Sequence, residues 1–181
     1  MKNLDQRHRW GLLLAMVMVV PAMPAAAQID LGGIAKKAAK SAGDTASGEV
    51  IKKVNAKLLA EGRKNQCSFK TDSDELMAGC DTKLKKLANT LVEMKKQLEA
   101  GNVKAYKFEV SGHTDSRGKA DHNKELSKKR AAVIARELAA RGVPEGEIIS
   151  VGMGPDKPVV TPDDTPAKQA KNRRYEIQVK L

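Results

Sequence analysis

The clearest pattern along the chain is a stripe of apolar residues that recurs every three or four positions. It predicts an amphipathic helix that stops at Gly101-Asn102, and its members are Leu84, Leu87, Leu91, Met94 and Leu98. A second helix is predicted from about residue 121 to residue 141, where Gly142 and Pro144 supply stop signals. Each helix has one apolar face, so both are expected to pack on a shared core.

Strands are predicted in four places. Tyr106, Phe108 and Val110 alternate with charged residues, in a run that ends at Ser111-Gly112. The other three candidates are residues 66–70, 148–151 and 175–181. In this order, the elements predict an α/β fold: a βαβαββ sandwich whose helices pack on one face of a mixed four-stranded sheet.

The first 27 residues have the pattern of a secretory signal peptide. Basic residues precede an apolar run from residue 10 to residue 20, and Ala25-Ala26-Ala27 offers a cleavage site. The run is shorter than the roughly 20 residues that span a bilayer, so an uncleaved anchor is the weaker alternative. We therefore expect export to the periplasm, where the two cysteines, Cys67 and Cys80, would form a disulfide.

Residues 28–65 predict a basic helical extension or linker. A break is expected between Gly43 and Gly48, and after it Val50, Val54 and Leu58 recur at helical spacing. Such a helix could lie on an anionic membrane surface, pack on its own domain, or bind an envelope partner or a second copy in a homodimer.

Charge narrows the choice of ligands. The formal charge is +11, and it remains +9 once the first 27 residues are removed. A basic chain suits nucleic acid, anionic lipid or an acidic polymer, but aromatic residues make up only 3% of it. Few aromatic platforms and export together argue against nucleic acid.

Two charged residues are placed unusually. Asp115 directly follows the second predicted strand, and Arg130 falls on the helix face that should meet the sheet. A guanidinium in that position needs a carboxylate, supplied either by the protein or by a ligand. Spacing alone leaves open a structural ion pair between Asp115 and Arg130 and a binding site for a small zwitterion.

A longer set of spaced residues resembles the OmpA-like peptidoglycan-binding domain over residues 66–181. The match consists of Gly112-His113-Thr114-Asp115, Asn123, Leu126-Ser127, Arg130-Ala131, Gly142-Val143, Gly152-Met153-Gly154, Pro158 and Asn172-Arg173-Arg174. The resemblance implies noncovalent binding of peptidoglycan, which would anchor the protein, and with it the outer membrane, to the cell wall.

The resemblance also assigns roles to residues. Asp115 and Arg130 would hold the ammonium and carboxylate of the diaminopimelate side chain in the stem peptide, as a fixed acid and a guanidinium fork can. Thr114, Asn123 and Asp72 would add contacts, and the neighbouring pair Asn172-Arg173 would orient the pocket. No cofactor is implied.

Some residues depart from the family pattern. Lys70 stands where an acid is common, Lys168-Gln169 replaces the usual Gly-Arg, and Tyr175 replaces a small aliphatic residue. These changes affect the expected rim of the pocket and leave the central pair intact.

Other functions fit less well. His113, Asp115 and His122 are residue types that bind zinc, but the resemblance gives them other places. No nucleophile with a base beside it stands out, so we do not expect an enzyme. The main alternative is a periplasmic adaptor whose N-terminal helix binds a partner or membrane surface, with the wall-binding domain as its anchor only.

Overall fold

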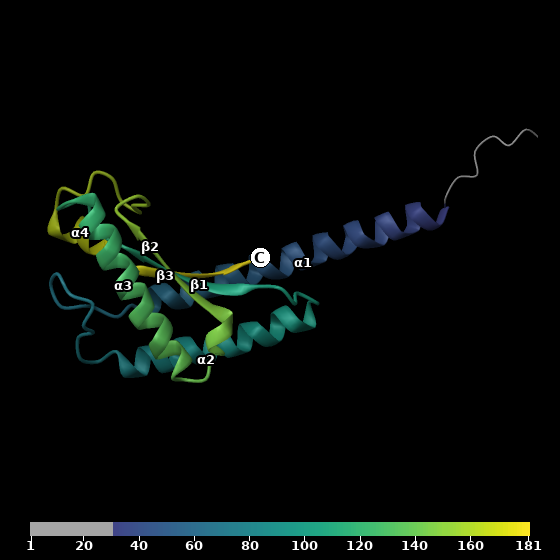
Figure 1. The fold of residues 1–181 in the computed structure, drawn as a ribbon, viewed down its shortest axis with the longest axis horizontal. Helices are drawn as coiled ribbons and strands as arrows, with labels where there is room; N and C mark the ends of the chain where they lie inside the picture. The colour runs from purple at the N-terminus through teal and green to yellow at the C-terminus, as the bar shows by residue number, and fades with distance from the viewer. Residues whose placement is uncertain (1–30) are drawn as a thin grey trace, which may run out of the picture.

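The computed structural model describes residues 31–181, and Figure 1 shows a mixed sheet with helices packed against it. The predicted signal peptide lies outside the described residues. In chain order the strands are β1 (Lys107–His113), β2 (Ile148–Gly154) and β3 (Tyr175–Lys180). They lie in the order β2-β1-β3, with β1 parallel to β2 and antiparallel to β3. The predicted mixed α/β fold is therefore confirmed.

Three long helices build the layer against this sheet: α1 (Leu31–Lys64), α2 (Asp81–Ala100) and α3 (Ala120–Ala139). α3 packs on β1 and β2, α1 packs on β3, and α2 contacts both α1 and α3. The predicted stripe of α2 is buried, with Leu87, Leu91 and Leu98 at 0% exposure. Phe108 and Val110 of β1 and Ile177 and Val179 of β3 form the sheet side of the same core.

The prediction of a fourth strand at residues 66–70 was wrong, because the sheet within residues 31–181 has three strands. In that segment the structure has only an isolated bridge between Phe69 and Leu76. The free edge of β3 is met by amide side chains instead. Gln66 bonds both backbone groups of Tyr175, at 2.8 and 3.1 Å, and Asn55 does the same for Val179, at 3.4 and 2.6 Å. These amides satisfy the edge as a neighbouring strand would.

α1 is one continuous helix, so the predicted break between Gly43 and Gly48 was wrong. Glycine lowers the stability of a helix by roughly 0.5–1 kcal/mol relative to alanine, and this penalty does not by itself end the helix. Toward its C-terminus, Val54 and Leu58 are fully buried in the core, while the N-terminal part projects past the sheet (Figure 1). Within residues 31–181, no helix combines the length and apolar character needed to cross a membrane.

Two short helices lie between the elements predicted from the sequence: η1 (Glu145–Glu147) and α4 (Pro166–Asn172). The start of α4 carries a recognisable signal. Thr165 caps it by accepting a bond from the Lys168 amide at 3.3 Å, and Pro166 occupies the first turn. α4 ends just before β3 begins. Its last residues therefore lie at the edge of the sheet where β1 ends.

Two glycines bring α3 close to the sheet. A methyl group on Gly112 of β1 would lie 2.2 Å from the Ser127 carbonyl oxygen, and one on Gly152 of β2 would lie 2.4 Å from the Lys124 carbonyl oxygen. Ser127 also accepts a bond from the Gly154 amide at 2.9 Å. These contacts fix the short distance between α3 and the end of β1, so the polar residues of α3 lie close to that end of the sheet.

Candidate functional site

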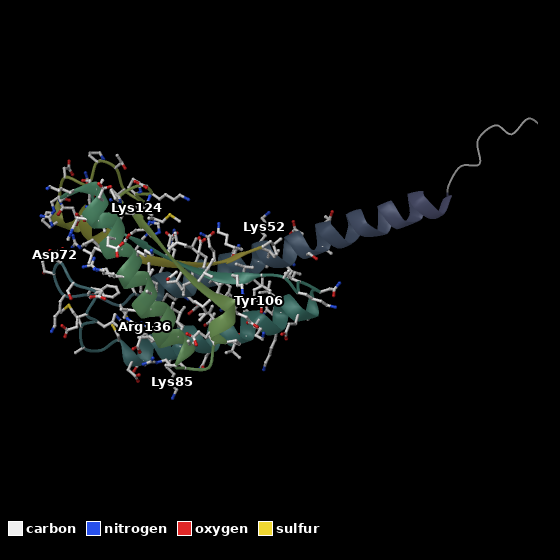
Figure 2. The ribbon with its side chains drawn as sticks, in the orientation of Figure 1. Lys52, Asp72, Lys85, Tyr106, Lys124 and Arg136 are labelled. Carbon is white, nitrogen blue, oxygen red and sulfur yellow. The ribbon has the colours of Figure 1, made fainter. Side chains whose placement is uncertain are left out.

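A groove of about 1060 Å³ opens at the C-terminal end of β1. Its walls are the loop before α2, the turn after β1, α3, the last turns of α1, and the junction of α4 with β3. Figure 2 shows Asp72 on that loop, at the end of the molecule where α4 lies. The groove brings together six residues proposed from the sequence: Asp72, Thr114, Asp115, Asn123, Arg130 and Arg173.

Asp115 lies just past β1, and its side chain is 9% exposed. One carboxylate oxygen accepts from the Arg117 amide at 3.2 Å, and the other accepts from Nη1 of Arg173 at 2.6 Å. A carboxylate can accept about four hydrogen bonds. Asp115 is therefore held in one orientation and still has capacity to accept from an ammonium group.

Arg130 reaches the groove from the middle of α3. Its Nε donates to the Ser73 carbonyl at 2.8 Å, its Nη2 donates to the Lys70 carbonyl at 3.3 Å, and its guanidinium carbon lies 5.1 Å from the centre of the Phe69 ring. Burial and the neighbouring charge of Arg173 lower the pKa of Arg130, which remains protonated. The side chain is thus fixed by uncharged groups.

The alternatives left open by the spacing can now be compared with the contacts. Among residues 31–181, Asp115 is paired with Arg173, and more loosely with Arg117 at 3.8 Å, and no carboxylate lies within ion-pair distance of Arg130. No ion pair joins Asp115 to Arg130. The half-buried Arg130 lines the groove, and within residues 31–181 its Nη1 has no hydrogen-bond partner, an arrangement that suits a carboxylate from a ligand.

The supporting residues differ in what they contact. Asn123 donates to the Arg117 carbonyl at 2.7 Å and so holds the turn that carries Asp115. Thr114 is 4% exposed, and its hydroxyl has no hydrogen-bond partner in the described part of the chain. Asp72 has a left-handed backbone, with φ at 49°, and its carboxylate lies 2.6 Å from Nε2 of His122. Asp72 therefore presents a polar group to the groove, the Thr114 hydroxyl is buried in its wall, and Asn123 shapes it.

Asn172 does not line the groove. Its side chain accepts from the amides of Val159 and Val160 and donates to Asp163 at 3.0 Å. Asp163 in turn accepts from the Ser116 hydroxyl and, at 2.9 Å, from the Ser116 amide. Hydrogen bonds from Ser116 and Asn172 lower the pKa of Asp163 to about 2. Asn172 thus fastens the loop before α4 to the residue next to Asp115.

His113 is 4% exposed and lines the groove beside Thr114. Burial, with a smaller effect of Arg174, lowers the pKa of His113 to about 4, so the ring is neutral at neutral pH. Its Nδ1 has no hydrogen-bond partner among residues 31–181. In the same region of the chain, no three His, Cys, Asp or Glu side chains are grouped so that they could hold a metal ion.

Cys67 and Cys80 are both 7% exposed and lie side by side, with Sγ of Cys67 3.9 Å from the Cys80 carbonyl oxygen. Both are free thiols in this structure, and the disulfide stays a prediction. Burial, with help from Cys80, raises the pKa of the Cys67 thiol to about 12. As thiols the pair would be unreactive in the folded protein.

Comparison with known families identifies the domain. The model of the OmpA family matches residues 68–173, which is more than half of the chain. The chain belongs to the OmpA family. The matched segment contains Asp72, Thr114, Asp115, Asn123, Arg130 and Arg173, and it excludes α1.

Curated relatives of the OmpA family match the same region. The peptidoglycan-binding protein ArfA of Mycobacterium tuberculosis is 43% identical over 70 residues, which are 39% of this chain and 21% of that protein. A peptidoglycan-associated lipoprotein of Agrobacterium fabrum is 32% identical over 96 residues, or 53% of this chain and 49% of that protein. The chain therefore spans between about a fifth and about half of these relatives.

Solved structures share the fold. The peptidoglycan-associated lipoprotein of Burkholderia pseudomallei has a TM-score of 0.52 and 26% identity, and the alignment covers 64% of this chain and 89% of that one. The C-terminal domain of Helicobacter pylori MotB has a TM-score of 0.53 at 20% identity, covering 64% and 84% of the two chains. The second likeness concerns the fold alone.

Several groups at the site were not found from the sequence. They are the carbonyls of Lys70 and Ser73, the Phe69 ring, the ion pair of Asp115 with Arg173, and the contact of His122 with Asp72. Backbone acceptors carry no signal in a sequence. Phe69 was assigned to a strand, so its place under Arg130 could not be anticipated.

Proposed function

We propose that this protein binds peptidoglycan noncovalently and is thereby attached to the cell wall. The ligand group is the zwitterionic end of diaminopimelate in the stem peptide. Its carboxylate is received by Arg130, and its ammonium is received by Asp115. The observation that carries the proposal is that Arg130 lines the groove with no carboxylate of residues 31–181 within ion-pair distance.

The charges around the groove support this assignment. Seven lysines and arginines and three acidic residues line the groove, so the groove as a whole has an excess of positive charge that a ligand carboxylate would offset. Asp115 keeps free acceptor positions for the ammonium on the same ligand carbon. Thr114 lines the groove next to Asp115, and its buried hydroxyl, which has no hydrogen-bond partner within residues 31–181, is assigned a supporting contact.

Names of relatives agree with this chemistry. One curated relative is named a peptidoglycan-binding protein, and others are named peptidoglycan-associated lipoproteins and outer membrane proteins. A place in the periplasm, in contact with the wall, follows from the proposal and agrees with the signal peptide expected at residues 1–27. These relatives match this chain over only part of their length. Anchoring of the outer membrane to the wall is therefore also a proposal for this chain.

The test is co-sedimentation of the purified mature protein with sacculi that contain diaminopimelate. Wild-type protein is expected in the pellet, and Asp115→Ala and Arg130→Ala are each expected in the supernatant. Arg136→Ala is the matched control, because Arg136 is an exposed arginine on the same helix and does not line the groove. Circular dichroism must show that all variants are folded. Two folded variants that sediment like wild type would rule out this site.

A second candidate function rests on the projecting part of α1. Thr45, Ala46 and Glu49 are exposed, and the helix continues beyond the sheet toward its N-terminus. That half can contact an envelope partner, a membrane surface or a second copy while the domain holds the wall. Sedimentation velocity of the mature protein tests the self-association, for which a concentration-dependent dimer is the supporting result and a monomer at all concentrations is the opposing one.

A further inference from the structure

A further part of the groove lining comes from two segments away from Asp115 and Arg130 in the sequence. They are the end of α1, with Leu59, Gly62 and Arg63, and the end of α4, with Ala170 and Lys171. We call this part the α1–α4 arm. Its α1 side precedes residue 68, so it lies outside the segment that matches the OmpA family.

The size of the groove leaves room for more than one amino-acid end group. Its volume is about 1060 Å³, and pockets of roughly 300–1,000 Å³ are typical for ligands the size of a drug molecule. A single zwitterionic carbon with its substituents fills only a small part of that space. The α1–α4 arm is therefore available to the portion of the ligand that follows.

Gly62 keeps the arm open. It lies in the last turns of α1 without a left-handed backbone, so no turn requires a glycine there. It is also not crowded, because a methyl group added to it would meet no atom within 4 Å. A glycine lowers helix stability by roughly 0.5–1 kcal/mol relative to alanine in a helix interior. Its effect at this position is to leave the groove wall without a side chain.

The arm also carries two unpaired cations. Arg63 and Lys171 are exposed, and neither has an acidic partner in the described part of the chain. Basic residues next to them are paired differently: Lys64 bonds Glu61 at 3.1 Å, and Lys168 bonds Asp164 at 2.7 Å. The two cations of the arm, Arg63 and Lys171, are thus left for an external anion.

We propose that the α1–α4 arm binds the next part of the stem peptide, and that Arg63 and Lys171 receive its second carboxylate. The inference rests on the proposed function, because it assigns the far end of the same groove. The ligand is then an acidic peptide in which Arg130 holds the carboxylate of the zwitterionic end and the arm holds the carboxylate of the preceding glutamate. It follows that α1 takes part in binding, in addition to covering the edge of β3.

The experiment measures the affinity of the mature protein for two soluble ligands by calorimetry. One is free meso-diaminopimelate, which has the zwitterionic end group and lacks the preceding glutamate. The other is the tripeptide L-Ala-γ-D-Glu-meso-diaminopimelate, whose glutamate keeps a free carboxylate. Wild type should bind the tripeptide at least about tenfold more tightly, which corresponds to about 1.4 kcal/mol.

Three variants separate the arm from the rest of the groove. Arg63→Ala with Lys171→Ala should remove most of the advantage of the tripeptide and change the affinity for free diaminopimelate less than about twofold. Gly62→Leu, which fills the arm, should do the same. Lys52→Ala with Lys85→Ala is the matched control, since it removes two exposed lysines that do not line the groove.

The outcomes distinguish this proposal from the one it rests on. If the arm variants bind the tripeptide as wild type does, while Arg130→Ala loses both ligands, the arm assignment is wrong and the wall-binding site stands. If wild type binds neither ligand, both proposals are overturned. Loss of tripeptide binding in the arm variants alone, with the control unchanged, supports the arm.

Discussion

A wall peptide that lacks the side-chain carboxylate should bind this domain much more weakly than one that has it. Replacing diaminopimelate by lysine in the same tripeptide removes that carboxylate and keeps the ammonium. Arg130 has five N–H donors, and two of them are occupied by the carbonyls of Ser73 and Lys70. The donors on Nη1 remain for the ligand.

The size of the effect follows from these contacts. A hydrogen bond to a charged group contributes about 1.5–3 kcal/mol, so the lysine peptide should lose about tenfold to about a hundredfold in affinity. The loss should not be greater, because the two carbonyls and the Phe69 ring still accompany Arg130 when the carboxylate is missing. Calorimetry with both tripeptides measures the difference directly.

A variant shows whether Arg130 is the cause. In Arg130→Ala the difference between the diaminopimelate and lysine tripeptides should fall below about twofold, because the group that recognises the carboxylate is gone. Arg136→Ala should preserve the full difference. Equal affinity of the wild type for the two tripeptides would refute the reasoning. It would mean that the two carbonyls and the Phe69 ring satisfy Arg130 within the protein, and that Arg130 does not bind the ligand carboxylate.

Three further predictions concern the fold around the site. Protein isolated from the envelope and alkylated in denaturant without reductant should gain no adduct in intact-mass analysis, because Cys67 and Cys80 would be bridged, and two adducts would disprove the bridge. Gln66→Ala should lower the free energy of unfolding in urea by about 1–3 kcal/mol, because it leaves buried backbone groups of β3 unpaired, whereas the exposed Gln97→Ala should change it little. Because the pKa of His113 is about 4 in the folded protein and about 6.5 when unfolded, stability should fall as the pH is lowered from about 6.5 to about 4, and His113→Leu should flatten that slope in urea titrations.

Periodicity was enough to predict the elements that carry one apolar face. The stripe of α2 and the alternation in β1 and β3 appear in the structure within a few residues of their predicted limits, because each pattern reflects burial along a single element. The strand that was wrongly predicted at residues 66–70 depends on tertiary contacts and not on a pattern within the segment. Whether Gln66 pairs through its backbone or its side chain depends on α1, which lies along the edge of β3, and no local pattern encodes that.

The same distinction applies to the groove. Strand ends and helix faces placed Asp115 and Arg130 on the same side of the fold, and the structure puts both in one groove. The sequence could not show that Asp115 pairs with Arg173, because that contact joins residues 58 positions apart through the end of α4. Nor could it show that the end of α1 is a wall of the groove, since its spacing fits core packing equally well.

Competition for the wall tests the central claim most directly. Mature protein bound to sacculi is washed with increasing free meso-diaminopimelate, or with Nα-acetyl-lysine amide at the same concentrations and ionic strength, and the released fraction is measured. The lysine derivative keeps a side-chain ammonium and has no carboxylate. If the zwitterionic end group is held between Asp115 and Arg130, diaminopimelate should release the protein at concentrations where the lysine derivative does not. Release by both compounds to the same extent, or by neither at any concentration that saturates the free protein, would contradict the account.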